Sequence, residues 1–359
     1  MRVEEALRVR GGACDGFRAI ALLLLVVGHF AITWVPGADT DVVQTLIGYS
    51  IVMLFVVSGF TLTWALTREF DERGTIALRP FFLRKAVRLF PTLLAFAAVT
   101  SVHHTVNGVD VDALRVASIA GLLVNYYNAL ALGDLTRHVV GHLWSIAVGA
   151  QFVLAWTLLL RAGLRRGTET RLAVVLSVVI FTAMMLRAVV YPQFTGLSAA
   201  YIYNATETRV DEMALGALGA LFLRIEVSRR ALDRLLEVGW LPIALSLALV
   251  FSLSRPTAYA NGFGHTIHAG LTVCLLMYAL HRSEGRLARL FSTRPLIFIS
   301  TISYSLFVWH LYGIALQPLF AGLPTLVELP LTVGVTIGGS WIAYLILERP
   351  FRRRAASWR

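Results

Sequence analysis

The sequence predicts an all-α integral membrane protein, a polytopic bundle of about ten transmembrane helices with one further re-entrant or interfacial segment. Three observations predict this fold. The 359 residues are 57% apolar and only 15% charged, whereas soluble domains carry about 25% charged residues. Mean hydropathy is +0.71. Apolar runs long enough to cross a bilayer recur along the chain with short loops between them. We therefore expect a single transmembrane domain over residues 1–359.

Eleven apolar runs are the candidate spans, taken here in chain order. They cover residues 18–35, 43–66, 89–106, 115–132, 139–160, 172–190, 211–226, 239–254, 264–280, 296–316 and 329–348. No small-residue cleavage site follows the first run, so we expect it to remain as a helix. The fourth run contains the polar stretch Asn125-Tyr126-Tyr127-Asn128, which favours a re-entrant or interfacial piece over a span.

The positions of the basic residues support ten spans. Cytoplasmic loops of membrane proteins are enriched in Lys and Arg. The basic loops all fall on one side of the membrane only if the fourth run does not cross it. These loops are 68–88, 161–171, 224–234 and 281–294, together with the N-terminal Arg2, Arg8 and Arg10 and the tail 349–359. We therefore expect a multi-pass cell-membrane protein with both termini in the cytoplasm.

The net charge of +11 comes from arginines in these loops, so it predicts a membrane topology and no nucleic-acid partner. Lys85 is the one lysine in a chain rich in arginine, a bias that favours a GC-rich bacterial source. Cys14 and Cys274 are far apart in sequence and belong to no CxxC or His/Cys cluster. We expect no disulfide and no metal site.

The first run holds two ionisable residues that are costly to place in a membrane. Arg18 and His29 are eleven residues apart, so on an α-helix they share one face at a separation of about 16.5 Å. An ionisable residue inside a span is a functional candidate. A neutral imidazole can act as a general base near pH 7, whereas arginine stays protonated and can hold an anion or pair with Asp15. A histidine hydrogen-bonded within the bundle is the structural alternative.

Seven short motifs occur in order between residues 15 and 351. They are Asp15-Gly16-Phe17-Arg18 with Gly28-His29-Phe30, Phe55-Val56-Val57-Ser58-Gly59-Phe60, Phe82-Leu83-Arg84-Lys85-Ala86-Val87-Arg88-Leu89-Phe90-Pro91, His142-Leu143-Trp144-Ser145-Ile146, Arg209-Val210-Asp211, Ser303-Tyr304-Ser305-Leu306-Phe307-Val308-Trp309-His310, and Glu348-Arg349-Pro350-Phe351. In this order they resemble the acyltransferase-3 family of integral membrane O-acyltransferases. The resemblance implies transfer of an acyl group from cytoplasmic acyl-CoA, a co-substrate rather than a cofactor, to a hydroxyl of a glycan, a glycolipid or a secondary-metabolite sugar.

The motifs supply the candidate site residues. His29 is the candidate base, with Arg18 as its catalytic partner. Arg84, Lys85 and Arg88 form one cationic face of a helix and suit the phosphates of a CoA donor, although an ordinary cytoplasmic anchor would look the same. Candidate acceptor-binding or site-lining residues are Asp15, Ser58, His142, Trp144, Ser145, Arg209, Asp211, Ser303, Tyr304 and His310.

Several of these have structural alternatives. Trp144 could be an interfacial anchor, and Arg209 with Asp211 could form a structural ion pair or a helix cap. Ser303, Tyr304 and His310 could make packing hydrogen bonds between helices. We expect Pro91 to stop one helical run and Pro350 to end the last one.

One position departs from the family's pattern. After Ile146-Ala147-Val148 the family usually has a glutamate, often a second acid, and a glutamine, whereas this chain has Gly149, Ala150 and Gln151. Asp15, Asp211 and Glu212 are the candidate replacements. The loss favours, as an alternative, a non-catalytic transporter or flippase on the same scaffold. The retained Arg18 and His29, with the basic Arg84–Arg88 stretch, favour the enzyme.

Overall fold

The computed structural model describes residues 12–35, 37, 40–130, 140–190, 192, 199–282 and 286–355. The N-terminal arginines and the last residues of the basic tail lie outside this part of the chain. Every regular element in the described residues is helical, with no strand among them. The predicted all-α fold is therefore confirmed. Helices satisfy their own backbone hydrogen bonds, which a bilayer core without water requires of a spanning segment.

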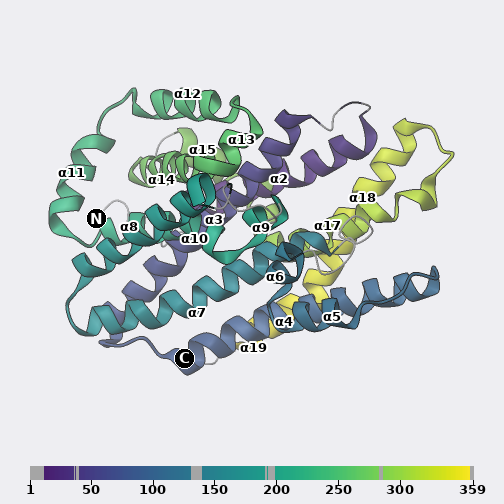
Figure 1. Ribbon diagram of the computed structural model, residues 1–359, viewed down its shortest axis with the longest axis horizontal. Helices are drawn as coiled ribbons and strands as arrows, with labels where there is room; N and C mark the ends of the chain where they lie inside the picture. The colour runs from purple at the N-terminus through teal and green to yellow at the C-terminus, as the bar shows by residue number, and fades with distance from the viewer. Residues whose placement is uncertain are drawn as a thin grey trace. The chain divides into compact units, whose positions relative to one another are not determined.

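The described chain, whose helices are labelled in Figure 1, forms two compact units by its internal contacts, each built from two stretches of sequence. Unit 1 contains the residues up to Ile76 and Val148–Ser300, and unit 2 contains Ala77–Ala147 and the residues from Thr301. One boundary falls inside α7 and another inside α16. Residues 1–359 as a single domain stay a prediction.

Unit 1 contains the following elements: α2 (Ala13–Trp34), α3 (Asp41–Arg73), most of α7 (Trp144–Arg165), α8 (Glu169–Met185), η2 (Leu186–Val190), α9 (Ala199–Asn204), α10 (Thr206–Phe222), α11 (Glu226–Leu236), α12 (Leu241–Leu253), α13 (Thr257–Tyr259), η4 (Ala260–Gly264), α14 (His265–His281), α15 (Arg286–Phe291) and α16 (Arg294–Thr301). Unit 2 contains α4 (Leu78–Val106), α5 (Ala113–Ala120), α6 (Val124–Ala129), η1 (Gly141–Leu143), α17 (Ser303–Ala315), η5 (Gln317–Phe320), α18 (Thr325–Ala343), η6 (Tyr344–Glu348) and α19 (Arg349–Ala355). η2, η4 and η6 are π-helical turns, and η1 and η5 are 3₁₀ turns.

Seven helical segments of the described chain are long and apolar enough to cross a membrane, and two bent helix pairs raise the number to nine if each is one span. The pairs are α11 with α12, bent by 91°, and α16 with α17, bent by 78°. The predicted run 211–226 lies on α10, whose 17 residues are about 25 Å long, at the lower limit for a span. The architecture agrees with the predicted polytopic helical bundle.

The fourth apolar run does not form one helix of spanning length. Its described part is divided between α5, of 8 residues, and α6, of 6 residues. α5 begins where Asp112 accepts hydrogen bonds from the backbone N–H groups of Leu114 and Arg115, at 2.8 and 3.2 Å. It ends at Gly121, and the next residue, Leu122, has a φ of 56°. This turn interrupts the helix, in agreement with the expected non-spanning segment.

Two prolines expected to end helical runs lie inside helices instead. Pro91 is within α4, which continues to Val106, so the loss of one backbone donor does not break this 29-residue helix. Pro350 lies in the first turn of α19. A proline is tolerated there because the backbone N–H that it lacks is not needed for a hydrogen bond within that helix. The preceding π-helical turn η6, in which the N–H of Arg349 donates to the carbonyl of Tyr344, carries the helix direction into α19.

The basic loop predicted over 68–88 is much shorter than expected. α3 continues to Arg73 and ends at Gly74, whose φ of 69° is the left-handed conformation that favours glycine at a helix end. α4 begins at Leu78. The cationic residues expected in a loop therefore lie mostly on helices.

Helix α3 is central to unit 1, where it packs against α2, α10 and α14. Two glycines bring α3 and α10 close together. A Cβ on Gly59 would lie 2.0 Å from the carbonyl oxygen of Met213, and one on Gly216 would lie 2.1 Å from that of Val56. Close backbone approach through small residues is how membrane helices gain packing contacts. The glycine of the Phe55–Phe60 motif is therefore explained by packing.

Candidate functional site

His29 lies on α2 in a half-buried position, one helical turn after Leu25. Its Nδ1 is 2.8 Å from the carbonyl oxygen of Leu25. A carbonyl can only accept, so the neutral imidazole carries its proton on Nδ1 and its lone pair on Nε2. This is the tautomer that a general base acting through Nε2 requires. Because α2 is uninterrupted from Ala13 to Trp34, Arg18 lies on the same face as His29.

Arg18 forms the ion pair that the sequence allowed. Its guanidinium donates to Asp15 at 3.0 Å, and the same carboxylate oxygen accepts a hydrogen bond from Ser300 Oγ at 2.9 Å. Both side chains of the pair stay about a quarter to a third exposed, at 26% and 32%. This pair joins the start of α2 to α16.

In unit 2, the basic motif on α4 meets the Glu348 motif. Arg88 Nε lies 3.6 Å from Glu348 Oε1. The Glu348 side chain is fully buried and also accepts from Ser305 Oγ at 3.0 Å and from Arg352 at 3.2 Å. The Arg88 side chain is 44% exposed. The sequence treated Glu348 as part of a helix end, and the structure makes it the buried counter-ion of the cationic face.

The motif on α17 meets the same region. Tyr304 donates to the carbonyl oxygen of Leu89 at 2.7 Å, next to Arg88 in the chain. Ser303 is buried at the start of α17. Three motifs that are distant in the sequence therefore come together in unit 2. Arg84 is half-buried beside them on α4, and the exposed Lys85 lies 5.7 Å from the centre of the Phe81 ring.

His142 and His310 form an imidazole pair within an aromatic cluster of unit 2. Their ring centroids are 5.1 Å apart, with the ring planes at 76°. His142 Nε2 contacts the carbonyl oxygen of Val308 at 3.1 Å, and His310 Nδ1 contacts that of Phe307 at 2.7 Å. Trp144 and Ser145 follow His142 and are each 5% exposed. Trp144 is thus buried in the protein, unlike an interfacial anchor.

In unit 1, Asp211 of α10 pairs with Arg187, a residue that the sequence analysis did not select. Arg187 lies in η2 and donates to both carboxylate oxygens of Asp211 at 2.9 Å. It also donates to the carbonyl oxygens of Gly262 and Thr208 and to Thr266 Oγ1. Thr266 in turn donates to Asp211 at 2.5 Å. This fully buried pair ties α10 to the two π-helical turns η2 and η4.

Arg209 has a different set of partners. Its Nε lies 2.8 Å from Glu212 Oε1, with both side chains fully buried. Its NH1 lies 3.4 Å from His265 Nε2, and its guanidinium carbon lies 4.9 Å from the centre of the Tyr203 ring. Arg209 and Asp211, which the sequence placed together in one motif, therefore belong to neighbouring but separate pairs.

The region where the family usually has acidic residues is open in this chain. A Cβ on Gly149 would have no atom within 4 Å. Gln151 accepts a hydrogen bond from Thr206 at the start of α10, so α7 contacts α10 through a neutral amide. Of the three candidate replacements, Asp15 and Asp211 are both held by an arginine and a hydroxyl, and Glu212 is the buried carboxylate beside Arg209. Ser58 is half-buried on α3.

The functional candidates that sequence reasoning missed share one signal. Arg187 and His265 are ionisable residues within apolar runs, and Glu348 ends another such run. An ionisable residue within a span is costly, so it is expected to be paired and is a candidate for function. This signal could have selected all three residues. Among the described residues, no group of three or more His, Cys, Asp or Glu side chains could hold a metal ion.

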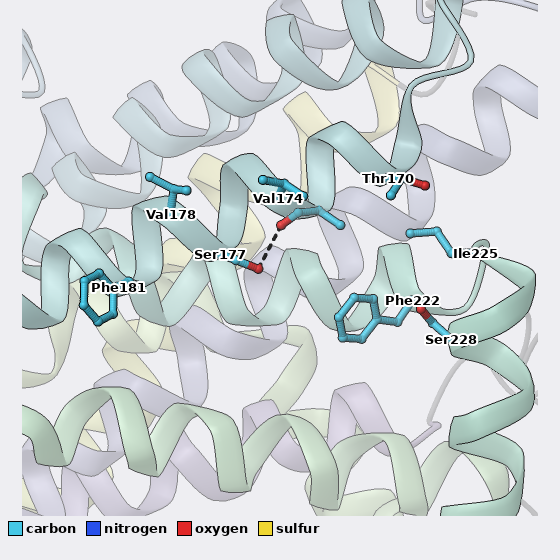
Figure 2. A pocket seen from close by; sticks show the side chains of 9 residues that line it. Thr170, Val174, Ser177, Val178, Phe181, Phe222, Ile225 and Ser228 are labelled. Carbon is cyan, nitrogen blue, oxygen red and sulfur yellow. Dashed lines mark hydrogen bonds between the residues drawn. The ribbon is translucent and has the colours of Figure 1, made fainter.

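A groove of about 480 Å³ lies along α8 and the junction of α10 with α11 (Figure 2). Its lining is apolar or hydroxyl-bearing and carries no charge: Thr170, Ala173, Val174, Ser177, Val178, Phe181, Phe222, Ile225 and Ser228. The hydroxyl of Ser177 is bonded to the carbonyl of Ala173 in its own helix, at 3.0 Å. This groove has no group that could act as a base or bind a phosphate, so it is not the candidate site.

Comparison with known proteins agrees with the motifs. A family model described as an acyltransferase domain matches residues 12–345. The chain belongs to this acyltransferase family. A relative from Staphylococcus aureus (strain COL), named "Putative O-acetyltransferase", is 26% identical over 374 residues, which cover 96% of this chain and 58% of the relative.

Two further relatives of the family have more specific names. "Putative peptidoglycan O-acetyltransferase YrhL" of Bacillus subtilis (strain 168) is 26% identical over 94% of this chain and 54% of its own length. "O-acetyltransferase OatA" of Staphylococcus aureus (strain NCTC 8325 / PS 47) is 25% identical over 82% of this chain and 49% of its own length. The chain thus spans about half the length of these curated relatives. No solved structure matches it.

Proposed function

We propose that the protein is a membrane-bound O-acyltransferase that moves an acyl group from cytoplasmic acyl-CoA to a hydroxyl of a glycosylated acceptor. The acceptor would be a cell-envelope glycan or glycolipid, or a secondary-metabolite sugar. The observation that carries the proposal is His29, an imidazole on an apolar membrane helix with its proton held on Nδ1 by Leu25. Family membership and relatives named as O-acetyltransferases support the reaction class.

In the proposed reaction, His29 Nε2 takes the proton of the acceptor hydroxyl as its oxygen attacks the thioester carbonyl carbon. The C–O bond of the new ester forms and the C–S bond to CoA breaks. The proton on His29 then passes to the CoA thiolate, so the products are the ester and the free thiol. Arg18 stays protonated throughout. Its place on the same face of α2 suits it to an anionic part of the donor, in competition with Asp15.

The proposed donor site is the cationic face of α4. Arg84, Lys85 and Arg88 offer several charged donors to phosphate oxygens, and arginine binds phosphate in a bidentate manner. Glu348 holds the Nε edge of Arg88, at 3.6 Å. This contact fixes the direction of a side chain that is 44% exposed. Glu348 would therefore position the Arg88 side chain for the donor without contacting the donor itself.

The test follows label from radioactive acetyl-CoA, propionyl-CoA and longer acyl-CoAs into a panel of hydroxylated acceptors, with purified protein in detergent or native membranes. His29→Ala should lower transfer by about 10²–10⁴-fold, the usual contribution of a general base. Yield and thermal stability should stay close to those of the unchanged protein. His281→Ala, at the end of α14, is the matched control. If His29→Ala keeps more than about a tenth of the activity, the assignment of the base is wrong.

A non-catalytic transporter or flippase remains the second candidate, favoured by the neutral Gly149-Ala150 segment where the family usually has acids. The same assay separates the two. A transporter would bind or move an acylated lipid without releasing CoA thiol, whereas the proposed enzyme releases one thiol for each ester formed.

A further inference from the structure

The strongest unexplained feature of unit 1 is spare hydrogen-bonding capacity beside Arg209. Within the described part of the chain, neither carboxylate oxygen of Glu212 has a geometrically acceptable hydrogen bond, although Oε1 is 2.8 Å from Arg209 Nε. His265 Nδ1 is also buried without a partner there. The Glu212 side chain is fully buried, and His265 is 5% exposed. A buried polar group without a hydrogen bond is energetically costly, so these two groups are candidates for binding a ligand.

The missing partner has a definite chemistry. Arg209 NH1 faces His265 Nε2 at 3.4 Å, and arginine can only donate, so the neutral imidazole accepts at Nε2 and carries its proton on Nδ1. The cluster therefore offers one spare donor, His265 Nδ1–H, and one spare acceptor, Glu212 Oε2. Hydroxyl groups both donate and accept. A polyhydroxylated ligand fits this combination, whereas an anion would be repelled by the carboxylate.

The edge of the cluster also suits a sugar. Tyr203, on α9, is the partly exposed member of a group in which Arg209, Glu212 and His265 are buried. Its ring covers the Arg209 guanidinium at 4.9 Å and lies 6.5 Å from the His265 ring. A ligand approaching the cluster along α9 would thus meet an aromatic face first and the polar atoms behind it.

The cluster and the residue before His29 both contact the N-terminal half of α3. A Cβ on Gly28, the neighbour of His29, would lie 2.5 Å from Ile47 Cγ1 on α3. A Cβ on Gly48, the next residue of α3, would lie 3.8 Å from His265 Cε1. Gly28, next to His29, and His265 of the cluster therefore meet α3 at consecutive residues. Consecutive residues of an α-helix point about 100° apart, so Gly28 and His265 approach α3 from different directions.

We propose that Glu212 and His265, aligned by Arg209, bind a second hydroxyl of an extended polyhydroxylated acceptor, an oligosaccharide rather than a single sugar. This inference rests on the proposed function for its link to His29. The binding site itself can be tested without any acyl transfer, so the two can fail separately.

The decisive variants are two neutral replacements of His265. The amide nitrogen of asparagine can take the place of Nδ1, and that of glutamine takes the place of Nε2. His265→Asn should keep the spare donor, whereas His265→Gln should remove it. Binding of N-acetylglucosamine and of its dimer, tetramer and hexamer is measured by isothermal titration on the solubilised full chain. We expect the tetramer to bind more tightly than the single sugar, and His265→Gln to weaken it about tenfold, as for one lost hydrogen bond.

His265→Asn should bind the tetramer within about twofold of the unchanged protein, a small part of the effect of one hydrogen bond. Glu212→Gln, which turns the spare acceptor into a donor, should weaken it about as much as His265→Gln. With saturating acetyl-CoA, both weakening variants should raise the acceptor KM and leave the donor KM and kcat unchanged. The site is refuted if no oligomer binds the unchanged protein, or if His265→Asn and His265→Gln bind equally. If a buried water occupies this position instead of a ligand, the variants should lose thermal stability while their affinity for the oligomers stays unchanged. That result would also refute the proposed site.

Discussion

Two neighbouring carboxylates on α10, Asp211 and Glu212, each pair with an arginine but differ in how completely they are hydrogen-bonded. Asp211 is held by both outer nitrogens of Arg187 at 2.9 Å and by Thr266 at 2.5 Å. Glu212 is approached by Arg209 at one oxygen and keeps the other unused among the described residues. Both carboxylates are fully buried, so burial does not distinguish them. Hydrogen bonding does: both oxygens of Asp211 accept hydrogen bonds, whereas neither oxygen of Glu212 accepts one of acceptable geometry among the described residues.

The largest effect is expected from neutralising the pair of Asp211 and Arg187. Asp211→Asn removes the charge that compensates Arg187 and disturbs three hydrogen bonds. Breaking one partner of a buried pair costs about 3–5 kcal/mol of unfolding free energy. Glu212→Gln should cost less, because it weakens one ion-pair contact with Arg209 and removes no hydrogen bond of acceptable geometry. Thermal unfolding of the purified variants measures both. If Glu212→Gln destabilises the protein as much as Asp211→Asn, the distinction between the pairs is wrong.

A smaller change should sharpen the same comparison. Thr266 accepts from Arg187 at 2.6 Å and donates to Asp211, so Thr266→Val should lower stability by about 1–3 kcal/mol. It should leave oligosaccharide affinity unchanged, since Thr266 contacts only the pair of Asp211 and Arg187 in the described structure. The control is Thr272→Val on the same helix, whose hydroxyl bonds the carbonyl of His268 and Tyr49. Lost oligosaccharide binding in Thr266→Val alone would show that the two pairs act as one network.

Unit 2 contains a third pair that differs from both, because Glu348 is buried and Arg88 is 44% exposed. An exposed cation on a buried anchor can still meet a ligand. Arg84→Ala combined with Arg88→Ala should raise the KM for acyl-CoA more than the KM for the acceptor, and the donor KM should rise with salt. Arg68→Ala, paired on the surface with Glu72, is the control. An unchanged donor KM would leave the cationic face as a membrane anchor.

The smallest expected effect on the protein comes from a test of topology, which asks which side of the membrane three loop positions face. Single cysteines at Asp110 and Thr136, in a chain lacking Cys14 and Cys274, should react with an impermeant thiol reagent in intact cells. Thr136 lies outside the described residues. A cysteine at Arg166 should react only after lysis, because the basic 161–171 loop is expected inside. Labelling of Asp110 and Thr136 from opposite sides would show that the fourth run crosses the membrane. The expected cytoplasmic termini would then be wrong.

Much of the fold was predictable from local pattern, because a bilayer imposes length, hydropathy and helical hydrogen bonding on each span separately. Each of the eleven apolar runs coincides with helical structure in the described chain. The limits of the elements were less predictable. Gly74 ends α3 by its backbone conformation, but Pro91 and Pro350 do not end their helices. Whether a proline ends a helix depends on the conformation of the turns around it, such as the π-helical turn η6 before Pro350. The periodicity of apolar residues in the sequence does not reveal these conformations.

The sequence by itself determined the membrane-bundle class, the family motifs, and the spacing that puts Arg18 and His29 on one face of α2. These depend on residues close together in the chain or on composition. Glu212 is within helical reach of Arg209 in the sequence itself, as an i,i+3 pair. Only the tertiary structure decided the distant partners: Arg187 for Asp211, His265 for Arg209, and Glu348 for Arg88. The partners Arg187, His265 and Glu348 lie 24, 56 and more than 200 residues away, and a buried charge takes whichever partner packing brings within hydrogen-bond distance. Helical spacing gives no information about contacts between helices, and these contacts distinguish a structural ion pair from a binding site.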